Sequence, residues 1–106
     1  MDNTTKHDRE IVKQVILKYA QLRPSHGQIR LDTVFDETQN RYLLMQVGWD
    51  NKQRISGDII YITLHDGKVY LEYDGIEHGI YEDLVNQGIE EERIILAFQQ
   101  DQKSLN

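Results

Sequence analysis

The first part of the chain places an apolar residue at every third or fourth position, which is the spacing of one helix face. Residues between 11 and 22 carry this stripe, with polar side chains such as Lys13 and Lys18 opposite. The stripe consists of Ile11, Val12, Val15, Ile16, Tyr19 and Leu22. It predicts a helix that covers a sheet. Thr5 and Asp8 have the spacing of a capping box at its start, and Pro24 predicts its end.

After Gly27 the apolar positions alternate with a period of two, which is typical of strands. Apolar runs separated by polar turns predict four strands in meander order, at residues 29–35, 41–49, 54–65 and 68–73. Asp66-Gly67 predicts a type I′ hairpin, because both residues tolerate positive φ. Ile59 to Ile62 is apolar on both faces, which favours a central strand.

Alternation also predicts which side chains share a face. Ile29, Leu31, Thr33 and Phe35 fall on one side of the first strand. On the second strand we expect the side facing the helix to carry Leu43, Met45, Val47 and Trp49, which leaves Tyr42 and Leu44 on the other. On the fourth strand, either Tyr70 or the Val69/Leu71/Tyr73 set faces away. If the second face of the sheet is exposed to solvent, its tyrosines would form a protein-docking surface. Alternatively, the second helix packs on that face and buries them.

The end of the chain predicts a short helix from Ile80 to Gln87 with Gly88 as its C-terminal cap. A charged bend, Glu90 to Glu92, leads into a last strand at residues 94–98, and residues 99–106 read as a frayed tail. The whole pattern predicts a single α+β domain over residues 1–106. Its expected core is an antiparallel β-meander of four to five strands, with the long N-terminal helix on one face and a short helix near the C-terminus.

Composition narrows the functional classes. The chain has no cysteine, so a disulfide framework or thiolate chemistry is excluded and a reducing cytoplasm is the expected location. No apolar run approaches the roughly 18 residues of a membrane span. The net charge of −6 is uneven: residues 1–34 hold six Lys/Arg against four Asp/Glu, and residues 35–106 hold six against fourteen. An acidic field repels phosphate, so direct nucleic-acid binding is disfavoured.

No motif predicts a cofactor, a metal or a catalytic group: the histidines are scattered, and no phosphate-binding glycine loop occurs. Two alternatives remain. Glu72, Asp74 and Glu77 suggest a metal-dependent phosphodiesterase, although no E-x-K or D-x-K follows them. A small DNA-binding recombination factor would instead use the basic side chains of the first helix and its end, Lys6, Arg9, Lys13, Lys18 and Arg23.

Several segments together resemble the XisI family, named for the fdxN element excision controlling factor of cyanobacteria. They are Gln46-Val47-Gly48-Trp49-Asp50 with Arg54, the His65-Asp66-Gly67-Lys68-Val69-Tyr70 hairpin, and Asp74-Gly75 through Asp83-Leu84-Val85 to Gly88. The resemblance covers nearly the whole chain. It implies an accessory factor of programmed DNA excision that acts beside a nuclease-like companion, XisH, and it carries over no catalytic residues.

We therefore expect a non-enzymatic protein that binds a XisH-like companion, and self-association stays open. The acidic stretch with Glu90, Glu91 and Glu92 is the predicted contact with a basic surface of that companion. Trp49 and Arg54 flank a tight turn and are predicted to form a rigid recognition corner, with Tyr70 as a further contact.

Overall fold

The described part of this computed structural model, residues 3–22 and 28–99, forms one sheet and two α-helices. Its elements are, in chain order, α1 (Asn3–Ala20), β1 (Gln28–Asp36), β2 (Arg41–Asp50), β3 (Gln53–His65), β4 (Lys68–Asp74), α2 (Tyr81–Gln87), the 3₁₀-helix η1 (Glu91–Arg93) and β5 (Ile94–Leu96). The predicted α+β class is confirmed. No described helix is both long and apolar enough to cross a bilayer. The turn expected at 23–27 and residues 100–106 of the expected tail lie outside the described residues.

The sheet has the strand order β1-β2-β3-β4-β5. The first four strands pair antiparallel as the predicted meander, whereas β5 pairs with β4 in parallel. A parallel neighbour requires the chain to cross back along the sheet before it pairs. The segment with α2 and η1 makes this crossing, which places the short helix beside α1.

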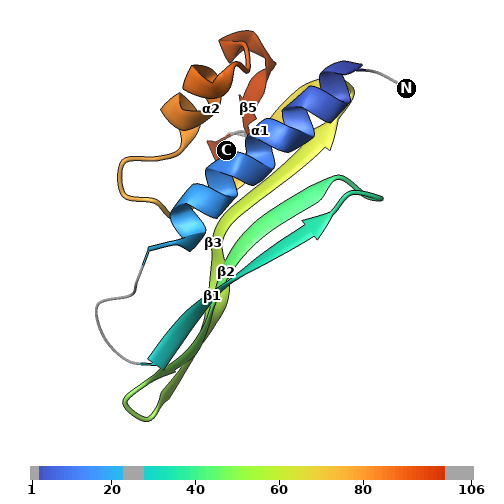
Figure 1. Cartoon of the computed structure of the whole chain (residues 1–106). Helices are drawn as coiled ribbons and strands as arrows, with labels where there is room; N and C mark the ends of the chain where they lie inside the picture. The colour runs from blue at the N-terminus through green and yellow to red at the C-terminus, as the bar shows by residue number, and fades with distance from the viewer. Residues whose placement is uncertain (1–2, 23–27, 100–106) are drawn as a thin grey trace.

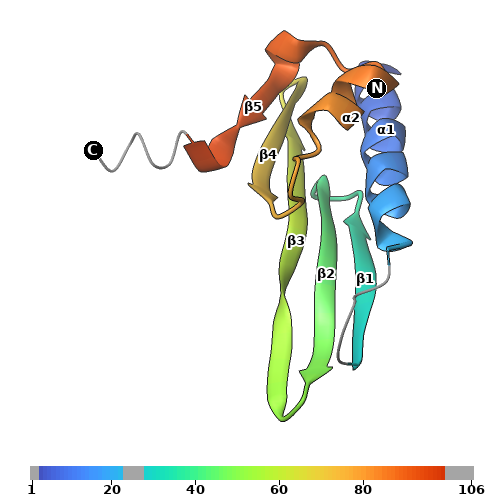
Figure 2. The same cartoon turned by 90° about the vertical axis from the view of Figure 1, so that its left-hand side faces the viewer.

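Both α-helices lie on the same side of the sheet, to the upper left of the strands in Figure 1. The β2–β3 hairpin and the beginning of β1 extend beyond the end of α1, as Figures 1 and 2 both show. The opposite side carries no element of the described chain, and we call it the open face. Its central side chains are Val34, Leu43, Met45, Trp49, Tyr61 and Tyr73. The second helix therefore does not cover a second core.

The helix stripe packs on the sheet as the sequence predicts. Buried side chains of α1 are Ile11, Val12, Val15, Ile16 and Tyr19. They meet a sheet surface built from Tyr42, Leu44, Ile60, Ile62 and Leu71, all of them buried. Leu22 is 57% exposed, because the helix ends at Ala20. Its assignment to the buried stripe is wrong.

β2 turns the opposite set of side chains toward the helices from the set we expected. Tyr42 and Leu44 are fully buried, whereas Trp49 is 48% exposed. The expected inward set, Leu43, Met45, Val47 and Trp49, lies on the open face. The β1 register explains the choice: Phe35 pairs with Tyr42, and their rings lie 5.9 Å apart in the core. Both sides of β2 are apolar, so alternation alone gave no basis for choosing between them.

A bulge in β4 decides how its tyrosines point. Val69 and Leu71 are buried on the helix side. The register with β3 shifts between Tyr61 and Ile62, so Tyr73 comes opposite Tyr61 on the open face. Without the bulge, Tyr73 would follow Leu71 inward. Tyr73 is instead 47% exposed.

The ends of the elements confirm two predictions and correct two. The last strand, expected at residues 94–98, ends at Leu96, and residues 97–99 are helical, so Gln99 does not belong to a frayed tail. Asp66 and Gly67 have φ values of 51° and 73°, the positive values that a type I′ turn requires. Gly88 caps α2, and its N–H donates to the carbonyl of Val85. α1 begins at Asn3, before Thr5, so the capping box that paired this residue with Asp8 is wrong.

Candidate functional site

The predicted recognition corner forms at the far end of the β2–β3 hairpin. Trp49 and Arg54 are directly opposite each other in the register. The guanidinium carbon of Arg54 lies 5.5 Å from the centroid of the Trp49 ring. An exposed arginine over an indole face gains about 0.5–1 kcal/mol. This contact favours the stacked arrangement of the two side chains, and their role in binding stays a prediction.

Gly48 is the residue that lets β2 carry this corner. A Cβ atom at Gly48 would lie 2.0 Å from the carbonyl oxygen of Gln28 and 2.8 Å from the Cα of Ile29. Backbone atoms cannot move aside as a flexible side chain does. Only glycine therefore allows β1 to approach this closely, next to the tryptophan. This gives a structural reason for the glycine in the Val47-Gly48-Trp49 segment.

Tyr70 lies on the same side of the sheet but far from the corner. It pairs with Thr63 of β3, nine residues along the strand from Arg54. A rise of about 3.3 Å per residue puts about 30 Å between these two positions. The structure therefore does not bring Tyr70 together with Trp49 and Arg54, and one small ligand cannot contact all three.

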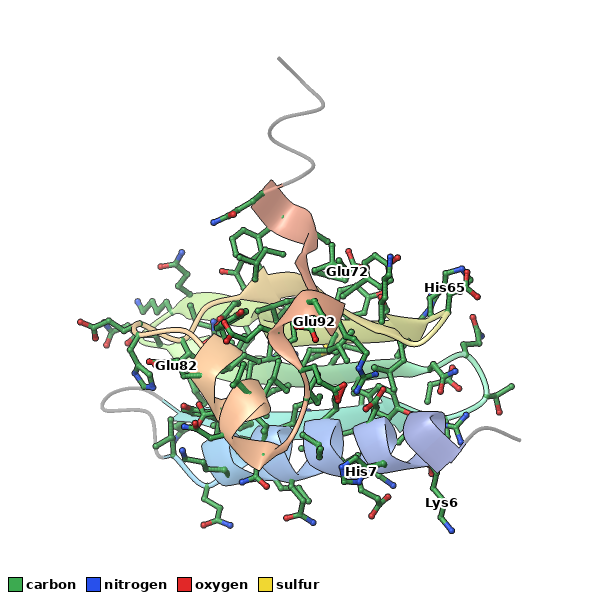
Figure 3. The ribbon with its side chains drawn as sticks, turned by 90° about the horizontal axis from the view of Figure 1, so that it is seen from above. Lys6, His7, His65, Glu72, Glu82 and Glu92 are labelled. Carbon is green, nitrogen blue, oxygen red and sulfur yellow. The ribbon has the colours of Figure 1, made fainter. Side chains whose placement is uncertain are left out.

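A second surface, which we call the acidic end, lies on α2 and η1. It consists of Glu82, Glu90, Glu91 and Glu92. Arg93 donates to Glu90 at 3.0 Å, and the Tyr81 hydroxyl donates to Glu91 at 3.1 Å. The other two carboxylates are exposed and accept no hydrogen bond from any described residue. Figure 3 shows Glu82 on α2 and Glu92 on η1, on the side of the molecule that this view faces.

Three of these acidic residues, Glu90, Glu91 and Glu92, border an open recess between α2 and η1. Val85, Gly88 and Ile89 contribute its apolar lining. Burial, together with the hydrogen bond to Glu91, raises the pKa of Tyr81. A carboxylate rim around an apolar floor suits a long basic side chain, which can lay its methylene stem on the floor and its charge on the rim.

A hydrogen-bonded cluster that the sequence did not reveal fastens α2 to α1. The Tyr19 hydroxyl donates to Asp83 at 2.5 Å, and Lys18 pairs with the other oxygen of Asp83 at 2.8 Å. His78 Nε2 lies 3.0 Å from the same hydroxyl, which therefore accepts its proton. Burial and the bond to Asp83 raise the pKa of Tyr19 to about 12. Burial opposes ionisation of Asp83, but hydrogen bonds from Lys18 and Tyr19 lower its pKa.

A buried ion pair holds η1 in place from the other side. Arg93 donates to both oxygens of Asp8, at 2.7 and 2.8 Å, and to the carbonyl of Gly67 at 2.9 Å. Hydrogen bonds to Asp8 raise the pKa of Arg93. The guanidinium thus joins the start of α1, the β3–β4 turn and η1. It fixes the carboxylates of the acidic end to the rigid part of the fold.

The carboxylates of the metal-dependent alternative point apart. Glu72 accepts a hydrogen bond from Thr63 at 2.8 Å on the open face. Asp74 accepts from the backbone N–H of Ile80 at 2.8 Å, on the helix side, and orders the turn before α2. Glu77 is exposed on that turn. Among the described residues, no group of three histidine or carboxylate side chains is placed to hold a metal ion.

The basic residues of α1 are mostly engaged with other parts of the protein. Arg9 donates to Asn40, Lys13 pairs with Glu37, and Lys18 pairs with Asp83. Lys6 is exposed, and Arg23 lies outside the described residues. This arrangement does not present a row of free cations to a phosphate backbone, which the DNA-binding alternative requires.

These features define a small α+β domain with one helix-covered and one open sheet face. The chain belongs to the XisI family, whose model, described as "XisI protein", matches residues 1–105. Comparison with curated proteins gives no match.

Two solved structures from Anabaena variabilis share the fold. One is the fdxN element excision controlling factor XisI, which is 32% identical, with 90% of this chain and 92% of that chain covered and a TM-score of 0.74. The other is a XisI-like protein, 30% identical, with 89% and 85% covered and a TM-score of 0.80. The resemblance inferred from the sequence is thereby confirmed.

Proposed function

We propose that this protein is a controlling factor of DNA-element excision that acts by binding a nuclease-like, XisH-like companion and has no active site of its own. Family membership supports the controlling role, because a relative of 32% identity carries the description of an excision controlling factor. The companion is the class of partner that the family resemblance implied.

The acidic end is the surface that carries the proposal. Its four carboxylates lie on α2 and η1, two short elements that the Asp8–Arg93 pair and the Tyr19–Asp83 bond fix to α1. A rigid acidic surface recognises a basic one with little loss of conformational freedom. A nuclease presents such a basic surface to its DNA. Binding there would control access of the companion to its substrate.

The charge of the chain supports a protein partner over a nucleic acid. The net charge is −6, because residues 35–106 carry −8 and residues 1–34 carry +2. Such a field repels a phosphate backbone and accelerates association with a basic protein. The described carboxylates and histidines also converge on no metal site, which leaves the phosphodiesterase alternative without a ligand set.

The experiment neutralises the acidic end and measures binding to a purified XisH-like protein from the same cells over a range of salt. Glu90→Gln, Glu91→Gln and Glu92→Gln together keep the side-chain shapes and the acceptor for Arg93. We expect roughly tenfold weaker binding at low salt and a flatter dependence on ionic strength.

The matched control removes three carboxylates elsewhere: Glu10→Gln, Asp50→Asn and Asp66→Asn, which lie on α1, at the end of β2 and in the β3–β4 turn. This variant should bind nearly as the unchanged protein does, because its acidic end is intact. Equal losses in the two variants, or no loss in the first, would contradict the proposed docking surface.

A further inference from the structure

The open face carries a continuous row of apolar side chains across four strands. Val34 lies opposite Leu43, Leu43 opposite Tyr61, and Tyr61 opposite Tyr73. Residues directly opposite in neighbouring strands have their side chains in contact distance on one face. A second line runs along β2 from Leu43 through Met45 to Trp49. The two lines meet at Leu43 and form a T of apolar surface.

This surface is accessible in the described chain. Val34 is 43% exposed, Tyr73 47% and Trp49 48%. Soluble monomers rarely leave contiguous apolar patches larger than a few hundred Å² exposed. Both α-helices lie on the other side of the sheet, so neither covers it (Figure 1).

We propose that the open face is the interface between two copies of this chain. The inference does not rest on the companion protein, which would occupy the acidic end on the helix side. The open face and the acidic end are separate surfaces, so self-association and companion binding can occur together.

Charge selects a second copy as the occupant. The strand register places both signs on the open face: basic Arg30, Arg41, Arg54 and Lys68, and acidic Asp32, Asp36, Asp58 and Glu72. The face is therefore balanced, although the chain carries −6. Two copies that approach through any acidic surface repel each other, whereas the open faces meet without net repulsion. A strongly basic partner is attracted to the acidic end instead.

The size of the face also suits a dimer. Four strands spaced about 4.8 Å apart are about 19 Å wide, and ten residues rise about 33 Å, which gives a flat area of about 600 Å². Side-chain relief increases this area. A standard stable interface buries about 800 Å² on each partner, so the open face approaches what one such interface needs.

Light scattering after gel filtration, with the full chain loaded at about 1 to 100 μM, tests the proposal. We expect a mass of about 25 kDa, twice the 12.5 kDa of one chain. The test variant is Val34→Glu with Tyr73→Glu, two exposed positions that would bring four new negative charges into the interface of a dimer. We expect a dissociation constant raised by about 100-fold or more, because like charges in an interface cost several kcal/mol.

The control is Leu17→Glu with Leu22→Glu, which adds the same charge at two exposed apolar positions on the helix layer. This variant should remain a dimer. Far-UV circular dichroism of both variants establishes that they are folded. A mass of one chain at every concentration would overturn the proposal, and so would a dimer that persists in the Val34/Tyr73 variant. Equal dissociation of the control would also overturn it, since the interface would then lie elsewhere.

Discussion

Asp8 and Arg93, 85 residues apart in the chain, form a buried two-point ion pair that ties the start of α1 to η1. Asp8 is 2% exposed, and both of its oxygens accept from the guanidinium. A third hydrogen bond from Arg93 reaches the carbonyl of Gly67. The pair therefore connects three segments that no continuous element joins, and the acidic end depends on it for its position.

Removing one partner of this pair should cost much stability, because it leaves the other charge buried and unpaired. Asp8→Ala leaves the guanidinium in a mostly buried site without its main partner, and the expected loss is about 3–5 kcal/mol of unfolding free energy. Asp8→Ala with Arg93→Ala should lose less than the sum of the two single changes. Urea unfolding followed by circular dichroism measures all four proteins. Additive losses would show that the pair does not act as a unit.

Gly48 and Gly57 provide a matched pair of glycine substitutions within the sheet. Gly48→Ala should destabilise the protein strongly, by about 3 kcal/mol or more, because its Cβ would lie 2.0 Å from the carbonyl oxygen of Gln28. Gly57→Ala meets no atom within 4 Å and should be neutral or slightly stabilising. Thermal unfolding of both variants is the measurement. Similar melting temperatures would contradict the close approach of β1 to β2.

Tyr19 should titrate later than an ordinary tyrosine. Burial and the hydrogen bond to Asp83 raise its pKa from 10.0 to about 12, so the folded state favours the protonated phenol. The resulting stabilisation is fully present below pH 10 and is lost as the pH rises through the folded value. In a pH titration followed by tyrosinate absorbance, one tyrosine should ionise at a higher pH than an ordinary tyrosine. This late step should be missing in Tyr19→Phe.

Asp83 supplies the control for this titration. In Asp83→Asn the negative charge beside Tyr19 is gone, so the late step should move back toward pH 10. In the folded protein the pKa of Asp83 is lowered from its ordinary value of 3.8. The ionised carboxylate therefore stabilises the folded state above pH 3.8, and this stabilisation is lost as the pH falls through the lower folded pKa. This acid-dependent part of the unfolding free energy should disappear in the variant. An unchanged late step would contradict the Tyr19–Asp83 bond.

Local patterns were enough to predict most elements of this fold, but not η1 or the helical residues 97–99, where the last strand was expected to continue. The stripe from Ile11 to Tyr19 has helical spacing, and Asp66-Gly67 has the chemistry of its turn, so α1 and the β3–β4 hairpin follow from neighbouring residues. The strand meander follows for the same reason. The parallel pairing of β5 depends on how α2 and η1 return the chain, which no local pattern encodes.

The orientation of the strands and the contacts of the site could not be predicted in this way. β2 is apolar on both sides, so only its register with Phe35 shows that Tyr42 faces the core. A bulge in β4 turns Tyr73 to the open face, and the alternation of apolar and polar residues in the sequence does not reveal where a bulge occurs. Asp8 finds its partner 85 residues away, which is a property of the folded core. The Trp49–Arg54 corner could be anticipated because a two-residue turn sets both residues opposite each other.

Purification of the tagged protein from its native cells, with identification of bound proteins and assay of bound DNA, tests the central claim most directly. The account predicts a nuclease-like companion in stoichiometric amount, held through the acidic end and released by salt, with no DNA retained once the companion is removed. Recovery of the chain with nothing but its own copies, or with DNA bound directly, would contradict it.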